Sequence, residues 1–191
     1  LKANLAGATF TADLVINGLT AGAGNGLSAN TAFGASALSA GASAQNRTAI
    51  GAFALTSSTG NNNTAVGAFA AAAFVSGANN TAIGQSALDA ATSGTNNTAV
   101  GNGALSGSTG STEATAVGAA AGAGATGIRG TYLGASAGNT TTTGTNNTVI
   151  GFNAQAASAG ASDTVTLGNS SITTLRCQVT SITALSDARD K

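Results

Sequence analysis

The stretch Asn79-Asn80-Thr81-Ala82-Ile83-Gly84-Gln85-Ser86-Ala87-Leu88 decides the fold, because a variant of it recurs every 16 or 17 residues. Each recurrence places one large apolar residue directly before a glycine. The glycines are Gly34, Gly51, Gly67, Gly84, Gly101, Gly118, Gly134, Gly151 and Gly168, and the residues before them are Phe33, Ile50, Val66, Ile83, Val100, Val117, Leu133, Ile150 and Leu167. So short and regular a period is typical of a solenoid that stacks one coil on the next. We therefore predict an all-β, parallel β-solenoid of about nine coils.

Within one unit, Thr81 and Ile83 alternate with Ala82 and Gly84, which is the period of a β-strand whose two faces differ. Stacking aligns equivalent residues into columns. We expect the column of large apolar residues from Phe33 to Leu167 to be buried, and the alanine column to let another backbone approach closely. The glycine should stand where a Cβ would clash or where φ is positive, before a second short strand or bend. The Asn pairs should form side-chain ladders.

The composition predicts a thin core that is shared between chains. Charged residues make up 6% of the chain, the formal net charge is zero, and Pro, Met, His and Trp are absent. Such a composition is also typical of disordered segments, but a disordered linker has no reason to place a large apolar residue before every repeated glycine.

The lack of a basic run argues against a nucleic-acid partner, and the longest strongly apolar run, residues 68–75, is too short for membrane insertion. We expect no cofactor and no metal. Cys177 is interpreted as a buried thiol, or as a residue that meets its own copies in an oligomer.

The repeat unit resembles the head repeats of trimeric autotransporter adhesins and, more closely, the repeat arrays of phage tail fibres. This resemblance spans Asn30 to about Gly168. It implies a homotrimer of parallel, left-handed β-rolls, and we expect the three chains to pack around one axis with their alanine faces inward.

The run VTLGNSSITTLRCQVTSITALSDARDK, from Val165 to Lys191, is similar to the joint between a phage fibre shaft and its self-cleaving intramolecular chaperone. The chaperone opens with Ser-Asp-x-Arg-x-Lys, which is matched by Ser186, Asp187, Arg189 and Lys191. The resemblance implies that Ser186 is the nucleophile, Lys191 its general base, and Leu185-Ser186 the scissile bond. A Ser-Lys dyad is chemically reasonable because a desolvated neutral amine can accept the hydroxyl proton.

These features divide the chain into an N-terminal lead-in or cap (1–29), the solenoid repeats (30–168), a joint (169–185) and the start of a truncated chaperone (186–191). The leading hypothesis is the structural shaft of a phage tail fibre or tail spike that serves host attachment. Its partners would be its own copies, other tail proteins and a host surface receptor, and its location would be the extracellular part of the virion. The alternative is a trimeric adhesin head on a bacterial surface.

Two further functions are less well supported by the residues. A polysaccharide depolymerase would need an acid pair, which the repeats lack, so we expect no enzyme apart from autoproteolysis. A regular Thr column on a flat solenoid can order water and bind ice. Because the Thr column shares a strand face with Ile and Val, we expect it to be buried, and this argues against ice binding.

Overall fold

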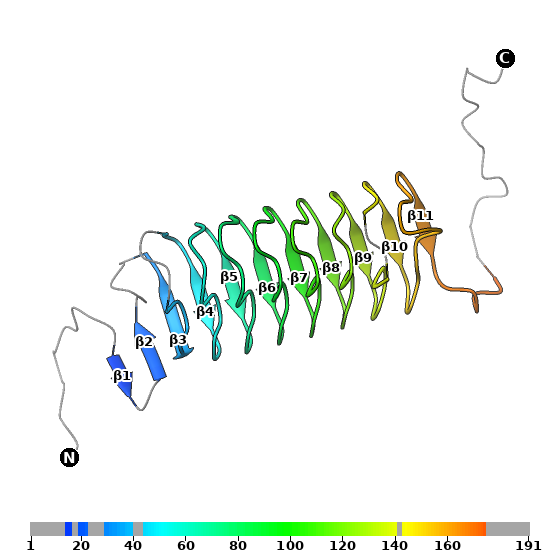
Figure 1. Ribbon diagram of the computed structural model, residues 1–191. Helices are drawn as coiled ribbons and strands as arrows, with labels where there is room; N and C mark the ends of the chain where they lie inside the picture. Colours follow the sequence, from blue (N-terminus) through cyan, green and yellow to red (C-terminus); the bar gives the residue numbers. More distant parts are fainter. Residues whose placement is uncertain (1–13, 17–18, 23–28, 40–43, 141–142, 175–191) are drawn as a thin grey trace.

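The computed structural model describes residues 14–16, 19–22, 29–39, 44–140 and 143–174, which form a slender rod of stacked coils (Figure 1). One sheet holds eleven strands in sequence order. The strands are β1 (Leu14–Ile16), β2 (Leu19–Gly22), β3 (Thr31–Ala35), β4 (Thr48–Ile50), β5 (Thr64–Val66), β6 (Thr81–Ile83), β7 (Thr98–Val100), β8 (Thr115–Val117), β9 (Thr131–Leu133), β10 (Thr148–Ile150) and β11 (Val165–Leu167). The described residues contain no helix. The predicted β-solenoid is confirmed.

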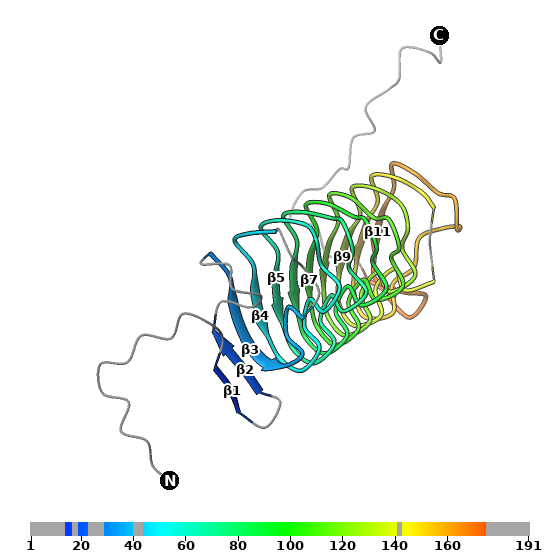
Figure 2. The same ribbon diagram turned by 60° about the vertical axis from the view of Figure 1, so that its left-hand side comes forward.

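Strands β3 to β11 are all parallel, and each pairs with the next so that equivalent residues lie side by side. Thr81 pairs with Thr98, and Ile83 pairs with Val100. With neighbouring strands about 4.8 Å apart, nine strands make a rod roughly 40 Å long. Figure 2 looks partly along this rod and shows the closed outline of the coils.

The N-terminal strands depart from the solenoid pattern. Strand β1 pairs antiparallel with β2, and β2 pairs antiparallel with β3. The lead-in therefore supplies a hairpin against the first solenoid strand. Such a hairpin occupies the edge of β3 that would otherwise offer unpaired backbone groups to another chain.

The repeated glycines allow the coils to stack closely. From Gly34 to Gly151 their φ angles lie between +126° and +143°, a region that side chains disfavour. A Cβ placed on Gly84 would lie 2.4 Å from the carbonyl oxygen of Gly101 in the next coil. Gly84 thus combines the two features predicted for the repeated glycine, a positive φ and a place where a Cβ would clash.

After each glycine the chain bends and forms no second strand. In the coil of β6, Ser86 and Leu88 are left-handed, with φ of 53° for both. The amide of Ser86 donates to Ala68 of the preceding coil, whereas the amide of Leu88 donates to Ala104 of the following coil. The amides of these two residues thus point in opposite directions along the rod, so both neighbouring coils are bonded.

The predicted faces of the strands are wrong. The alanine column lies inside a single chain: Ala49, Ala65 and Ala82 are at most 1% exposed, whereas Ile83 is 40% exposed. The core consists mainly of this column and of small residues and leucines from the bend, such as Ala87 and Leu88. Leucines from the bends fill much of the interior, so in most coils the inward strand position takes alanine and the large members of the alternation point outward.

One substitution in the core shows how tightly this interior is filled. Tyr132 replaces alanine in the inward column and is 3% exposed. In the two bends beside it, Gly122 and Gly138 replace the leucine found in other coils, and a Cβ on either would lie within 2.8 Å of the Tyr132 ring. The large ring is therefore offset by the loss of two side chains.

Candidate interaction surface

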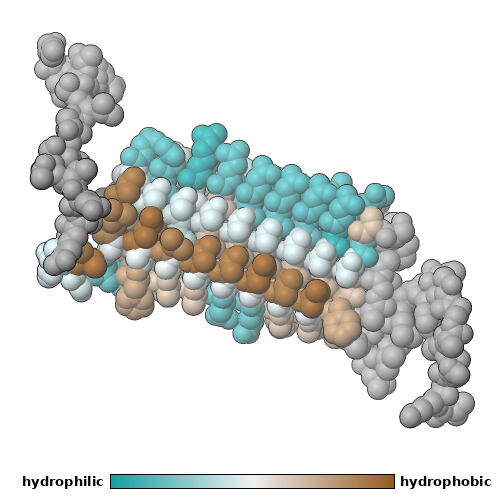
Figure 3. Space-filling model, turned by 180° about the vertical axis from the view of Figure 1, so that it is seen from behind, coloured by the Kyte–Doolittle hydropathy of each residue, from teal (hydrophilic) through white to brown (hydrophobic). Residues whose placement is uncertain are grey.

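The outward face of the sheet carries a continuous apolar row along the rod. We call this row the apolar stripe; it consists of Phe33, Ile50, Val66, Ile83, Val100, Val117, Leu133, Ile150 and Leu167. Six of its members are 37–51% exposed, and the other three are partly exposed. Figure 3 shows the stripe as a brown row bordered by paler rows, with a hydrophilic row beyond. A row of large apolar side chains this long is uncommon on the surface of a solitary protein and marks an interaction surface.

A row of threonines lies two residues before the stripe on the same face. It consists of Thr31, Thr48, Thr64, Thr81, Thr98, Thr115, Thr131 and Thr148. All eight are at least partly exposed, which contradicts the expected burial of this column. The argument from burial against a water-ordering function therefore does not hold for a single chain. Burial would argue against water ordering by the threonine row only if other chains cover this face.

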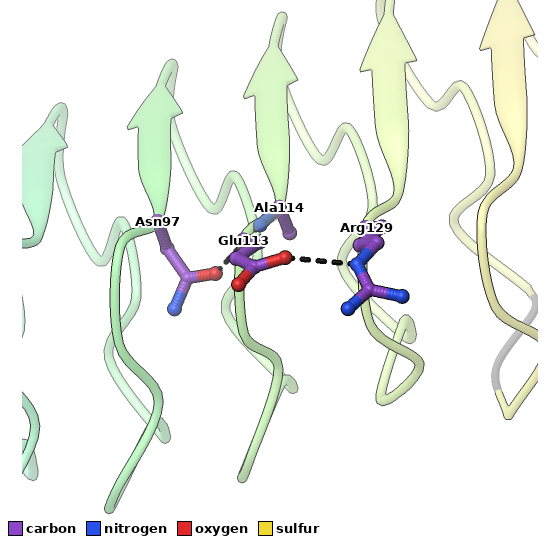
Figure 4. Close-up of polar contacts among 4 residues, drawn as sticks. All are labelled: Asn97, Glu113, Ala114 and Arg129. Carbon is purple, nitrogen blue, oxygen red and sulfur yellow. Dashed lines mark hydrogen bonds and ion pairs between the residues drawn. The ribbon is translucent and has the colours of Figure 1, made fainter.

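An outer row of asparagines borders the threonines, and here the predicted ladder is confirmed. The side-chain amide of Asn62 donates to Asn79, and that of Asn79 donates to Asn96, at 3.0 and 3.2 Å. These residues are left-handed, a conformation that Asn tolerates better than most residues. Farther along the row, Arg129 donates to Glu113 at 2.9 Å (Figure 4). Since both side chains are half exposed, this ion pair adds little to stability.

The second asparagine of each pair is buried and has a different role. Asn80 is 3% exposed; its side-chain oxygen accepts from the backbone amide of Asn97, and its side-chain amide donates to the carbonyl of Gly94. Figure 4 shows the equivalent bond from the Ala114 amide to Asn97. The inner asparagines thus join coils through the backbone, which the sequence reasoning did not separate from the outer ladder.

In the coil of β4, Arg47 stands at the position that the buried asparagine occupies in other coils. It is 1% exposed and donates to the Ser58 carbonyl. Burial lowers the pKa of its guanidinium.

Other kinds of site find less support in the described part of the chain. There, no three His, Cys, Asp or Glu residues lie close enough to hold a metal ion. A search of the same residues for a helix able to cross a membrane finds none. An open hollow at the C-terminal end of the rod has a neutral polar lining of Asn153, Gln155, Thr166, Gly168, Asn169, Ser170 and Ser171.

The predicted autocleavage residues, Ser186 and Lys191 with the Leu185-Ser186 bond, lie outside the described residues, as does Cys177.

Compared with protein-family models, curated proteins and solved structures, the chain gives no match. The apolar stripe, which the sequence reasoning placed in the core, is thus the main guide to function. The alternation itself does not indicate which face is outward, because it shows only that the two faces differ.

Proposed function

We propose that this chain is the structural shaft of a phage tail fibre or tail spike, in which three parallel copies associate through the apolar stripe. The observation that carries the proposal is the stripe itself, which continues on one face through all nine parallel strands. Association along the whole rod would bury it, whereas a partner of ordinary globular shape would cover only part of it.

The packing of the trimer differs from the arrangement expected from the sequence. The alanine faces cannot meet, because Ala82 and its equivalents are already buried within each coil. Large side chains such as Ile83 and Val100 would lie between the chains instead. This would also supply the large apolar contacts that the alanine-rich interior of a single rod lacks.

The oligomeric state is the first test. Light scattering on the fragment at micromolar concentration should give the mass of three chains. Ile83→Asp should reduce that mass, while Ser57→Asp on the partly exposed turn should leave it unchanged. A stable monomer of the wild-type chain would contradict the proposal.

The second test concerns the chaperone, whose presence in the full protein separates a phage fibre from an adhesin. The gene extended beyond Lys191 is expressed, and the products are weighed by mass spectrometry. We expect a shaft that ends at Leu185 in the wild type and an uncut precursor in Ser186→Ala. A wild-type precursor that stays intact would contradict self-cleavage and would favour the bacterial surface adhesin.

A further inference from the structure

We infer that the trimer contact joins two different surfaces on either side of the glycine column, so that the apolar stripe of one copy packs on the post-glycine surface of the next. The post-glycine surface comprises the first and second residues after each repeated glycine. This inference rests on the proposed function, since it takes the partner to be another copy of this chain.

The first reason is that the post-glycine surface also carries exposed apolar side chains. Phe53 and Phe69 are 41% and 44% exposed, and their rings stack with centroids 5.1 Å apart and planes 10° apart. Phe152 is 72% exposed. Alanine occupies several of the other positions, as at Ala119 and Ala135. The rod thus has apolar residues on both sides of its glycine column.

The second reason is the distribution of charge. The residue before the glycine, the glycine, and the two residues after it are uncharged in all nine coils. Glu113, Arg129 and Asp163 instead lie in the outer asparagine row, beyond the threonines. Charged residues are depleted at the centres of protein interfaces, whose rims are polar and accessible to solvent. The charge-free region is therefore centred on the glycine column and extends to both sides of it.

The third reason is symmetry. In a closed ring of three, each chain uses one surface toward one neighbour and a different surface toward the other. In this chain the two apolar surfaces meet at the glycine column, which has no side chains. The glycine columns of three chains can therefore face a common axis. A single stripe pairing with itself would instead favour a dimer.

The closed ring also sets the level of the contact. Rotation about an axis parallel to the rods leaves each coil at its own height. The stripe residue of one copy would therefore face the post-glycine residues of the same coil in the next copy.

Disulfide trapping between differently tagged chains tests the contact. In a Cys177→Ser background, one chain carries Ile83→Cys and the other carries Ser86→Cys, and the two are co-expressed and oxidised. We expect the mixed disulfide to form several-fold more than either disulfide between like chains. Val66→Cys with Ser86→Cys, which are one coil out of level, serves as the matched control and should trap several-fold less.

The outcomes separate this inference from the proposed function. Light scattering must first show that the reduced cysteine variants are trimers, and a second pair, Val66→Cys with Phe69→Cys, repeats the test in another coil. Trimers in which Ile83→Cys chains trap each other more than they trap Ser86→Cys chains would overturn the two-surface contact while the trimer stands. Equal trapping by the level and the shifted pairs would overturn the same-level packing. A monomer before any cysteine is introduced would overturn the proposed function itself.

Discussion

Substitution of Gly84 by alanine tests the stacking of the coils most directly. A Cβ at this position would lie 2.4 Å from the carbonyl oxygen of Gly101, which belongs to the backbone of the next coil and accepts a hydrogen bond from the Ala104 amide. The φ of +132° is also unfavourable for alanine. The backbone strain costs about 1–3 kcal/mol and the forced overlap about as much again, so we expect a loss of roughly 2–6 kcal/mol per chain.

Equilibrium urea denaturation followed by circular dichroism measures this loss, with all variants compared at one protein concentration. Gly110→Ala is the matched control. Gly110 has no atom within 4 Å of a built Cβ, and its φ lies outside the left-handed region. We expect the control to change stability by no more than about 1 kcal/mol, and in the stabilising direction if at all. Equal losses in the two variants, or no loss for Gly84→Ala, would refute the role of close backbone stacking.

Three further predictions concern the two faces, the core and pH. Ile83→Asp should leave the β-rich circular dichroism spectrum of the chain intact while weakening association, whereas Ala82→Asp should abolish folding because it buries an unpaired charge; equal effects would mean that the faces are assigned wrongly. Tyr132→Ala should cost about 3–5 kcal/mol through the cavity it leaves, and adding Gly122→Leu, at a left-handed position that leucine occupies in other coils, should restore part of this in urea denaturation. Burial raises the pKa of Asp89 above its usual range, so the folded state disfavours the ionised form and loses stability as pH rises through the carboxyl range. Asp89→Asn should therefore be more stable than the wild type at pH 7 and should lose that advantage in acid, as thermal unfolding at both pH values would show.

The function proposed for this chain depends on the contrast between its interior and its surface. Large apolar side chains usually indicate a core, yet in this rod those of the apolar stripe lie on the surface and the core is built mainly from alanine and leucine. The shared apolar surface therefore stays a prediction, although the assignment of the faces was wrong. The chains would meet through the Ile83 column and not through the Ala82 column.

The period in the sequence was sufficient to predict the solenoid, because a glycine that recurs every 16 or 17 residues is compatible with few architectures other than stacked coils. The need for glycine and the outer asparagine ladder followed from the same local chemistry, since each depends on one residue and its copy in the next coil. The direction of the strand faces did not follow, because alternation shows that two faces differ without showing which one is enclosed. The tertiary structure decided it: the space inside a coil is set by how the bends after Gly84 and its equivalents close the chain. The same closure separated the buried Asn80 from the exposed Asn79, two identical side chains whose environments differ only once the coil is formed.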